Sequence, residues 1–235
     1  MSRANEITFS REQEEVLYGT LLGDASMNNP NTGKRRHAVL QIEHSTKQIA
    51  YCQWKAEMLG MSYYTRDRYD VRTDKTYHSI VAYSQASPTY NTIYEKVYGT
   101  GGFKGLSREI LDGIGPLGLA VWYMDDGCTI YNGRICKLHT EKYTLAEQQI
   151  IQQWFIEKWN LHPTIQEKPS NGHMKYILVF TVTDSYTLMN IIRPFVVTPD
   201  LQYKVTTKPY TPSRIPQWHP DSQVSNSGVS DDEVI

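Results

Sequence analysis

The sequence predicts an α+β fold built from two similar halves, each with the element order αββαββα. A shift of 98 residues lays residues 78–94 over residues 176–192, and the helices and strands expected in the two halves follow the same order. Chance similarity between two amphipathic patterns is the alternative, but the agreement of element type throughout favours duplication. The matched pairs at this shift are Glu43 with Glu141, Thr46 with Thr144, Ser87 with Ser185, Thr89 with Thr187, and Ile93 with Ile191.

The composition of the 235 residues, with 40% hydrophobic and 21% charged side chains, is that of a folded globular protein. No apolar run reaches the roughly 18 residues that span a bilayer, and "MSRANEITFS" lacks the apolar core of a signal peptide. We therefore expect the cytoplasm, or the matrix or stroma of an organelle that encodes the protein. The three cysteines form no CxxC pair, which favours reduced thiols over disulfides or zinc ligands.

The formal charge of −1 hides an uneven distribution. Residues 215–235 contain no Lys or Arg but four acidic side chains, so the rest of the chain carries a net positive charge. The same end is rich in Pro, Ser, Asn and Asp, which is typical of a disordered terminus. The predicted organisation is an N-terminal half at 1–99, a linker at 100–115, a C-terminal half at 116–210, and a flexible acidic tail at 211–235.

The elements of the first half follow from local signals. Ser10 and Gln13 resemble a capping box, which predicts a helix that runs to Asp24. Residues 35–44 alternate between packed and exposed positions, as in a strand with one wet face. A helix follows from Thr46. Two further strands, at 62–71 and 76–84, are separated by the polar turn "RTDK", and Ser87-Pro88 begins another helix.

The second half repeats these signals. We predict a helix over 117–125, strands around Thr129 and Lys137, and a helix that begins at a Thr144–Glu147 capping box. Strands at Thr164 and Ile177 and a helix from Ser185 complete it.

Each half contains an almost wholly apolar helix that runs directly into an aspartate: "LYGTLLGD" ends at Asp24 and "LAVWYMDD" at Asp126. Such helices must be buried, so we expect them to pack together where the halves meet. Gly19, Gly23 and Ala120 allow a close approach, which brings the aspartates together. Two carboxylates beside free helix carbonyls favour a hard divalent cation, and we predict Mg²⁺. An aspartate after a helix is also a common turn former.

The two stretches "LYGTLLGDA" (residues 17–25) and "LAVWYMDDG" (residues 119–127) resemble the paired motifs of single-chain LAGLIDADG homing endonucleases. The resemblance covers most of residues 10–210. It implies that the motif helices form the interface between the halves, that the two antiparallel sheets form a saddle over DNA, and that Asp24 and Asp126 are the metal-binding catalytic pair. Two departures are Ala25 at the final Gly of the motif and Val121 at its packing Gly, which we expect to hold the helices slightly further apart.

Phosphodiester hydrolysis needs an activated water, neutralisation of the phosphate charge, and help for the departing 3′ oxygen, and metal ions can supply all three. The family usually has a lysine near each site, and Lys104 and Lys204 lie at matching places in the halves, although loop lysines are ordinarily only solvated. On the second strand of each half, Gln41, Glu43, His139 and Glu141 are candidates to orient water or to bind metal through solvent. Further candidates for the metal site are Gly23, Ala25 and Asp125.

Basic side chains on the predicted strand ribbons are candidates for DNA contacts, because such ribbons fit the major groove. A solvated sheet face with cross-strand ion pairs is the alternative. Interleaved tyrosines at 63, 64, 69 and 77 offer hydrogen bonds or stacking. The candidates are Lys34, Arg35, Arg36, His37, Arg66, Arg68, Arg72, Lys75, Arg134, Lys137, Lys142, Lys168, His173 and Lys175.

These observations predict a monomeric endonuclease that makes a double-strand break in a long asymmetric DNA site and requires no protein partner. The family implies staggered cuts with short 3′ overhangs. We expect Mg²⁺ as cofactor, Mn²⁺ as a substitute, and Ca²⁺ to bind without efficient cleavage. Two alternatives remain: an intron maturase that binds RNA, and a DNA-binding protein without catalysis. The ends of the chain lack the His-Asn pattern of protein-splicing elements, so a free-standing or intron-encoded reading frame is expected.

Overall fold

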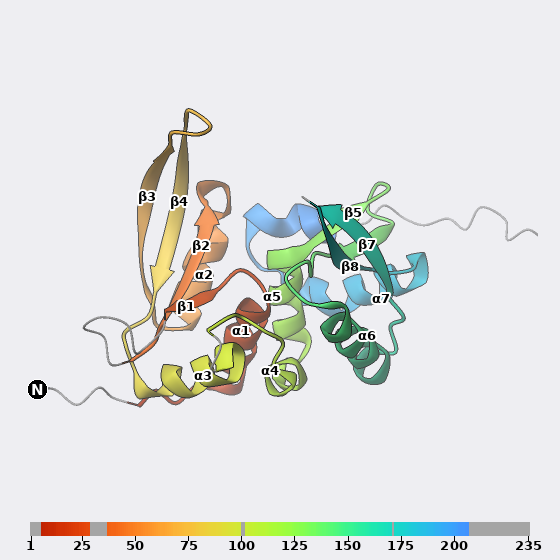
Figure 1. The fold of residues 1–235 in the computed structure, drawn as a ribbon, viewed down its shortest axis with the longest axis horizontal. Helices are drawn as coiled ribbons and strands as arrows, with labels where there is room; N and C mark the ends of the chain where they lie inside the picture. Colours follow the sequence, from red (N-terminus) through yellow and green to blue (C-terminus); the bar gives the residue numbers. More distant parts are fainter. Residues whose placement is uncertain (1–5, 29–36, 100–101, 171, 207–235) are drawn as a thin grey trace, which may run out of the picture.

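The computed structural model describes residues 6–28, 37–99, 102–170 and 172–206. It contains two four-stranded antiparallel sheets, one in each half, and two central helices, α1 and α5, that pack against each other between them (Figure 1). The predicted α+β fold with two antiparallel sheets is confirmed. The predicted tail at 211–235 lies outside the described residues.

The first half has the predicted order αββαββα. Its sheet has the strand order β1-β2-β4-β3, with Gln41 of β2 opposite Tyr83 of β4. Strands β3 and β4 form a long ribbon that extends beyond the neighbouring strands (Figure 1). The elements are α1 (Arg11–Leu22), β1 (Ser26–Asn28), β2 (Val39–Ser45), a 3₁₀ turn η1 (Thr46–Gln48), α2 (Ile49–Met58), β3 (Ser62–Asp70), β4 (Lys75–Tyr83) and α3 (Pro88–Tyr98).

The second half repeats this topology with the strand order β5-β6-β8-β7. A short helix, α4 (Arg108–Gly113), precedes it and packs on α1, so part of the segment predicted as a linker is helical. The other elements are α5 (Pro116–Asp126), β5 (Gly127–Ile130), β6 (Ile135–Leu138), α6 (Leu145–Trp159), β7 (Thr164–Ser170), β8 (His173–Val179), α7 (Val182–Ile192), and the 3₁₀ segments η3 (Arg193–Phe195) and η4 (Pro199–Val205).

Side-chain caps set most helix starts where the sequence predicted them. The Ser10–Gln13 and Thr144–Glu147 capping boxes are present, and the Ser87 hydroxyl caps α3. One start was wrong. Helix α7 begins at Val182 rather than Ser185, because the Thr181 hydroxyl accepts the Asp184 backbone N–H and caps the helix one turn earlier.

The two central helices touch through glycine. A Cβ placed on Gly19 of α1 would lie 2.4 Å from the Gly118 carbonyl oxygen and 2.9 Å from the Val121 Cβ of α5. Val121 therefore fits into the space that Gly19 leaves, and Gly118 supplies the small residue on the facing helix. The expected close approach is kept despite the departure from the motif at Val121.

Glu15 of α1 caps the facing helix across this interface. Gly115, at the start of α5, offers no side chain, and the Glu15 carboxylate accepts the Gly118 backbone N–H at 3.1 Å. A carboxylate at a helix N-terminus satisfies an otherwise unpaired donor and interacts favourably with the helix dipole. Glu15 is buried, with 8% of its surface exposed.

Replacing Glu15 with alanine is expected to lower the free energy of unfolding by roughly 1–2 kcal/mol, the usual cost of losing a helix cap. Urea denaturation followed by circular dichroism measures the change. Glu14→Ala, an exposed neighbour on the same helix, should change stability by less than about 0.5 kcal/mol. Equal effects of the two variants would show that Glu15 does not cap α5.

In the described ranges, no helix has both the length and the apolar surface needed to cross a bilayer.

Candidate functional site

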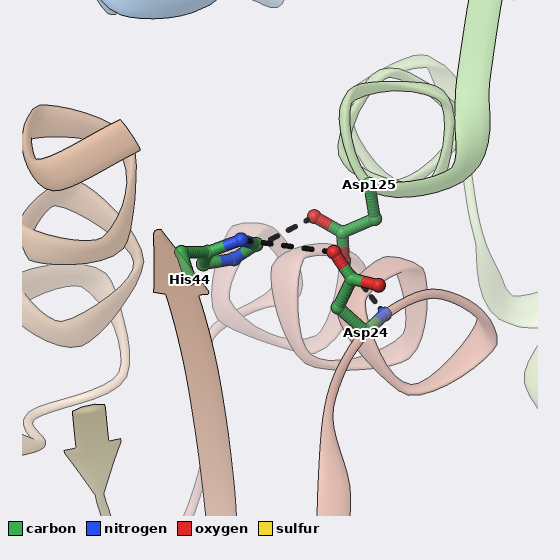
Figure 2. Close-up of side chains that lie close together, drawn as sticks. All are labelled: Asp24, His44 and Asp125. Carbon is green, nitrogen blue, oxygen red and sulfur yellow. Dashed lines mark hydrogen bonds and ion pairs between the residues drawn. The ribbon is translucent and has the colours of Figure 1, made fainter. Parts of the chain in front are cut away.

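The ends of α1 and α5 converge where the halves meet. Asp24 comes just after Gly23, the C-cap of α1, and Asp125 and Asp126 are the last two residues of α5. The Asp24 backbone N–H donates to the Asp125 carboxylate at 3.1 Å. Figure 2 shows the carboxylates of Asp24 and Asp125 together beside the imidazole of His44, and one ligand atom from each of these three residues lies within 4.8 Å of the others.

The side chain of Asp125 has no exposure to solvent, and protein donors surround its carboxylate. One oxygen, Oδ1, accepts from the Tyr51 hydroxyl at 2.8 Å and the Lys55 amine at 2.9 Å. The other, Oδ2, accepts from the Thr20 hydroxyl at 3.2 Å and from the Asp24 N–H. Burial alone would raise the pKa of Asp125, but Lys55, His44 and these hydrogen bonds hold it below its usual value. A carboxylate offers about four acceptor positions, and all four are taken.

The Asp24 carboxylate is in the opposite situation. Among the described residues, no group donates a hydrogen bond to it, and 41% of the side chain is exposed. The His44 imidazole lies 3.6 Å away as an ion-pair partner if protonated. Partial burial raises the pKa of Asp24, and the negative charge of Asp125 raises it further. Asp24 thus presents free oxygens in a place where nearby lysines only partly offset the effects of burial and of the Asp125 charge.

Asp126 lies at the equivalent position of the second half. Its Oδ2 accepts from the Trp122 indole at 3.2 Å and lies 3.4 Å from the Lys142 amine, and 14% of the side chain is exposed. Burial raises the pKa of Asp126 to about 6. The charges of Asp125 and Asp24 also raise it, while Lys142 lowers it. A divalent cation would relieve this electrostatic cost at Asp24 and Asp126, and carboxylate oxygens are the ligands that Mg²⁺ prefers.

The two predicted lysines lie at the ends of the two motif helices. The Lys104 amine donates to the carbonyls of Gly23 at 2.8 Å and Ala25 at 2.6 Å. The Lys204 amine, on η4, donates to the carbonyls of Met124 and, at 3.2 Å, Asp125. Burial lowers the pKa of Lys104 to about 7 and also lowers that of Lys204. These are partly buried amines beside the aspartates and not solvated loop side chains.

A second pair of inward-facing residues, His44 and Lys142, was not recognised from the sequence. The sequence predicts Lys142 as a DNA contact, but its amine donates to the carbonyls of Leu22 and, at 3.0 Å, Gly23, beside Asp126. His44 is also buried, with only 4% of its surface exposed. The repeat contained the signal: the shift of 98 that matches Glu43 with Glu141 also matches His44 with Lys142.

The structure divides the four candidates predicted on the second strands: Gln41 and Glu43 lie on β2, but the prediction was wrong for His139 and Glu141, which follow the end of β6 at Leu138. Glu43 forms a bidentate ion pair with Arg66, at 2.7 Å to each oxygen, and Gln41 lines a separate hollow with Tyr64 and Tyr83. In the second half, the Glu141 carboxylate binds His139 at 3.0 Å and Lys168 at 2.6 Å.

His139 is the member of this group that faces the site. Together with Asp126 and Lys204, it lines a pocket of about 420 Å³ at the end of α5. Its Nε2 also lies 3.3 Å from the Cys128 sulfur.

The predicted DNA-contacting residues are mostly on the exposed sheet ribbons, and some have acidic partners. Arg72 pairs with Asp70 at 3.3 Å, while Arg68 lies over the Tyr77 ring. The tyrosines at 63, 64, 69 and 77 are exposed. Three candidates, Lys34, Arg35 and Arg36, lie outside the described residues. The other exposed or partly exposed candidates are His37, Lys75, Arg134, Lys137, His173 and Lys175.

Comparison with known proteins gives consistent matches. The "Protein RecA" of Mycolicibacterium flavescens is 26% identical over 208 residues, which cover 83% of this chain and 47% of that protein. This chain thus spans about half the length, or less, of the RecA relatives that it matches. The "Cytochrome b mRNA maturase bI2" of Debaryomyces hansenii is 27% identical over 222 residues, covering 87% of this chain and 79% of the maturase.

Among solved structures, the homing endonuclease I-WcaI bound to its DNA recognition sequence shares the fold. Its TM-score is 0.74 at 23% sequence identity, with 86% of this chain and 89% of that chain covered. The model of the LAGLIDADG DNA endonuclease family matches residues 14–188, a range that contains both motif stretches (residues 17–25 and 119–127) and both sheets. The resemblance predicted from residues 17–25 and 119–127 is thereby confirmed: the chain belongs to the LAGLIDADG DNA endonuclease family.

Proposed function

We propose that this protein is a site-specific endonuclease that makes a Mg²⁺-dependent double-strand break, with short 3′ overhangs, in a long asymmetric DNA target. The observation that supports this most directly is the placement of Asp24 and Asp126 at the ends of two packed helices, each with carboxylate oxygens that the protein leaves available. The comparison with I-WcaI, which was solved on its DNA recognition sequence, supports the substrate class.

Asp24 and Asp126 would hold the metal ions. Mg²⁺ held there would supply water activation, neutralisation of the phosphate charge and stabilisation of the departing 3′ oxygen. The amines of Lys104 and Lys204 lie within hydrogen-bond reach of the carbonyls beside these aspartates, where a protonated amine adds positive charge for the phosphate and a neutral amine can accept a proton from water. His139 lines the pocket beside Asp126, where it can hold water by hydrogen bonds.

The two sheets would bind DNA on both sides of this site. The β3–β4 ribbon presents Arg68, Arg72 and Lys75 together with exposed tyrosines, as major-groove contacts require. Arg66 and Lys168, which pair with Glu43 and Glu141, would bind phosphate only if DNA displaced these surface partners.

The test uses the purified protein, MgCl₂ and a plasmid library that carries random inserts. Linearised plasmids are recovered and their ends sequenced. The expected result is one family of related insert sequences cut with short 3′ overhangs, with no cutting in EDTA and binding without efficient cutting in CaCl₂. Random ends, or no linear product in Mg²⁺ or Mn²⁺, would contradict the proposal.

An intron maturase is the second candidate, because the similarity to the maturase bI2 extends over most of both chains. Filter binding with a transcript of a group I intron and with a scrambled transcript tests it. Selective RNA binding without any DNA cleavage would favour this candidate over the endonuclease. A DNA-binding protein without catalysis is expected to bind a selected set of plasmid inserts and to leave them uncut.

The rate of DNA cleavage is expected to rise with pH through about 7 if Lys104 accepts a proton from the attacking water. Burial lowers the pKa of Lys104 to about 7, so its neutral form increases as pH rises through that value. Below it, the single-turnover rate should gain about tenfold per pH unit and then level off. Lys104→Arg keeps a protonated side chain and should lose this slope.

Lys96→Arg on α3 is the control, and its pH profile should match that of the wild-type protein. A wild-type rate that falls with pH, or equal slopes for wild type and Lys104→Arg, would exclude Lys104 as the proton acceptor.

A further inference from the structure

Lys55 and Asp125 form an ion pair with no exposure to solvent. Lys55 comes from α2 of the first half and Asp125 from α5 of the second, and both side chains are 0% exposed, with the amine and carboxylate 2.9 Å apart. The amine also donates to the Thr20 hydroxyl at 3.0 Å and lies 4.3 Å from the centre of the Tyr51 ring. Removing two charges from water costs free energy that their attraction barely offsets, so the pair adds little net stability. A role other than stability is therefore needed to explain it.

The hydrogen bonds of the pair extend to the backbone of Asp24. The Asp125 oxygen not bound by Lys55 accepts the Asp24 N–H at 3.1 Å, and Thr20 joins the two sides of the network. Gly23 is what allows Asp125 to lie there, because a Cβ on Gly23 would be 2.5 Å from the Asp125 side chain. We propose that Lys55 and Asp125 are a positioning pair: Asp125 of the second half, fixed by Lys55 of the first half, holds the metal-binding Asp24 in place.

The same contacts argue that Asp125 is not itself a metal ligand. Its four acceptor positions are filled by Tyr51, Lys55, Thr20 and the Asp24 backbone. A divalent ion bound to Asp125 would also lie close to the Lys55 ammonium group, which repels it. Asp24, whose carboxylate accepts no hydrogen bond from the described residues, is free to bind metal.

Of the two aspartates proposed to bind metal, Asp24 has such a positioning pair and Asp126, within the described residues, does not. The repeat matches Asp125 with Gly23, which has no side chain, and next to Asp126 the amine of Lys142 takes the corresponding inward position of His44. The pair therefore acts on Asp24 and not on Asp126. The inference rests on the proposed function, because it takes Asp24 as the residue that binds metal.

The test measures Mn²⁺ binding by electron paramagnetic resonance in an Asp126→Asn background, which leaves the Asp24 site alone. Lys55→Met keeps the length of the side chain and removes its charge. If the pair positions Asp24, Lys55→Met and Asp125→Asn each weaken Mn²⁺ binding at least about tenfold, as loss of a residue that orients a ligand does. If Asp125 is a ligand that Lys55 restrains, Lys55→Met tightens Mn²⁺ binding instead.

The double variant Lys55→Met/Asp125→Asn removes both buried charges and keeps an oxygen for the Asp24 N–H. The double variant also tests the proposal if a single variant does not fold. Its Mn²⁺ affinity should be no weaker than that of either single variant, because paired residues are not additive. Losses that multiply in the double variant would overturn the proposal. Glu57→Gln, an exposed change on the same helix, is the matched control and should bind Mn²⁺ as the parent does.

The melting temperature separates positioning from plain structural support. A purely structural pair would lower the melting temperature and leave the Mn²⁺ affinity of the folded protein unchanged, which would overturn the proposal. The Mn²⁺ measurement needs no DNA, so a protein that cuts no target but shows the expected affinity losses would refute the endonuclease and keep the positioning pair. A parent protein that binds no Mn²⁺ would refute both.

Discussion

Asp24→Asn is expected to reduce the single-turnover rate of DNA cleavage by about a thousandfold or more, equivalent to about 4 kcal/mol of transition-state stabilisation. Asparagine keeps the shape of the side chain but has no negative charge for a divalent cation. DNA affinity in CaCl₂ should change little, because the sheet ribbons supply the phosphate and base contacts. Asp126→Asn should lose activity to a similar extent.

The same substitution should leave stability unchanged or raise it, which separates lost chemistry from lost folding. The pKa of Asp24 is raised in the folded protein, so folding favours the protonated form and stability falls as pH rises through that pKa. A neutral asparagine removes this cost at pH 7. A lower melting temperature of Asp24→Asn would contradict this account of the site.

Asp112→Asn is the matched control for activity. Asp112 is on α4, exposed, and paired with Arg108 on the surface. Its replacement should leave the cleavage rate within about twofold of the wild type, because a surface ion pair contributes little. If Asp24→Asn cleaved as fast as Asp112→Asn, Asp24 would have no role in catalysis.

Gly19→Val is expected to have the largest effect on stability, with a loss of about 3 kcal/mol or more from the free energy of unfolding. The first added carbon would lie 2.4 Å from the Gly118 backbone oxygen, and this atom can move only if α5 moves. Displacing α5 also shifts Asp125 and Asp126 relative to Asp24. The loss is a large part of the 5–15 kcal/mol that stabilises a typical domain.

Urea denaturation measures this change, and Gly105→Ala is the control. A Cβ on Gly105 would meet only the Glu147 carboxylate at an ordinary 3.5 Å and a backbone oxygen at 3.9 Å. Its stability should change by less than about 1 kcal/mol. If Gly19→Val were as stable as Gly105→Ala, the helices would not depend on close contact at Gly19.

Much of the fold was predictable because its signals are local. The alternation along residues 35–44, the capping boxes at Ser10 and Thr144, and the repeat at a shift of 98 each depend on residues close in sequence or on a comparison of the chain with itself. The start of α7 was missed because Thr181 competed with Ser185 as the cap, and a local pattern did not decide between two hydroxyl residues.

The sequence by itself determined the paired topology, the two buried helices, and the aspartates at their ends, because apolar periodicity and the repeat specify them without knowledge of long-range contacts. Only the tertiary structure decided how the acidic residues differ. Asp125 and Asp126 are neighbours in sequence, yet the Asp125 carboxylate is surrounded by Lys55, Tyr51 and Thr20, while the Asp126 side chain keeps 14% of its surface exposed. Burial, charge and hydrogen bonding at a carboxylate come from residues up to about a hundred positions away, and no local pattern encodes that environment.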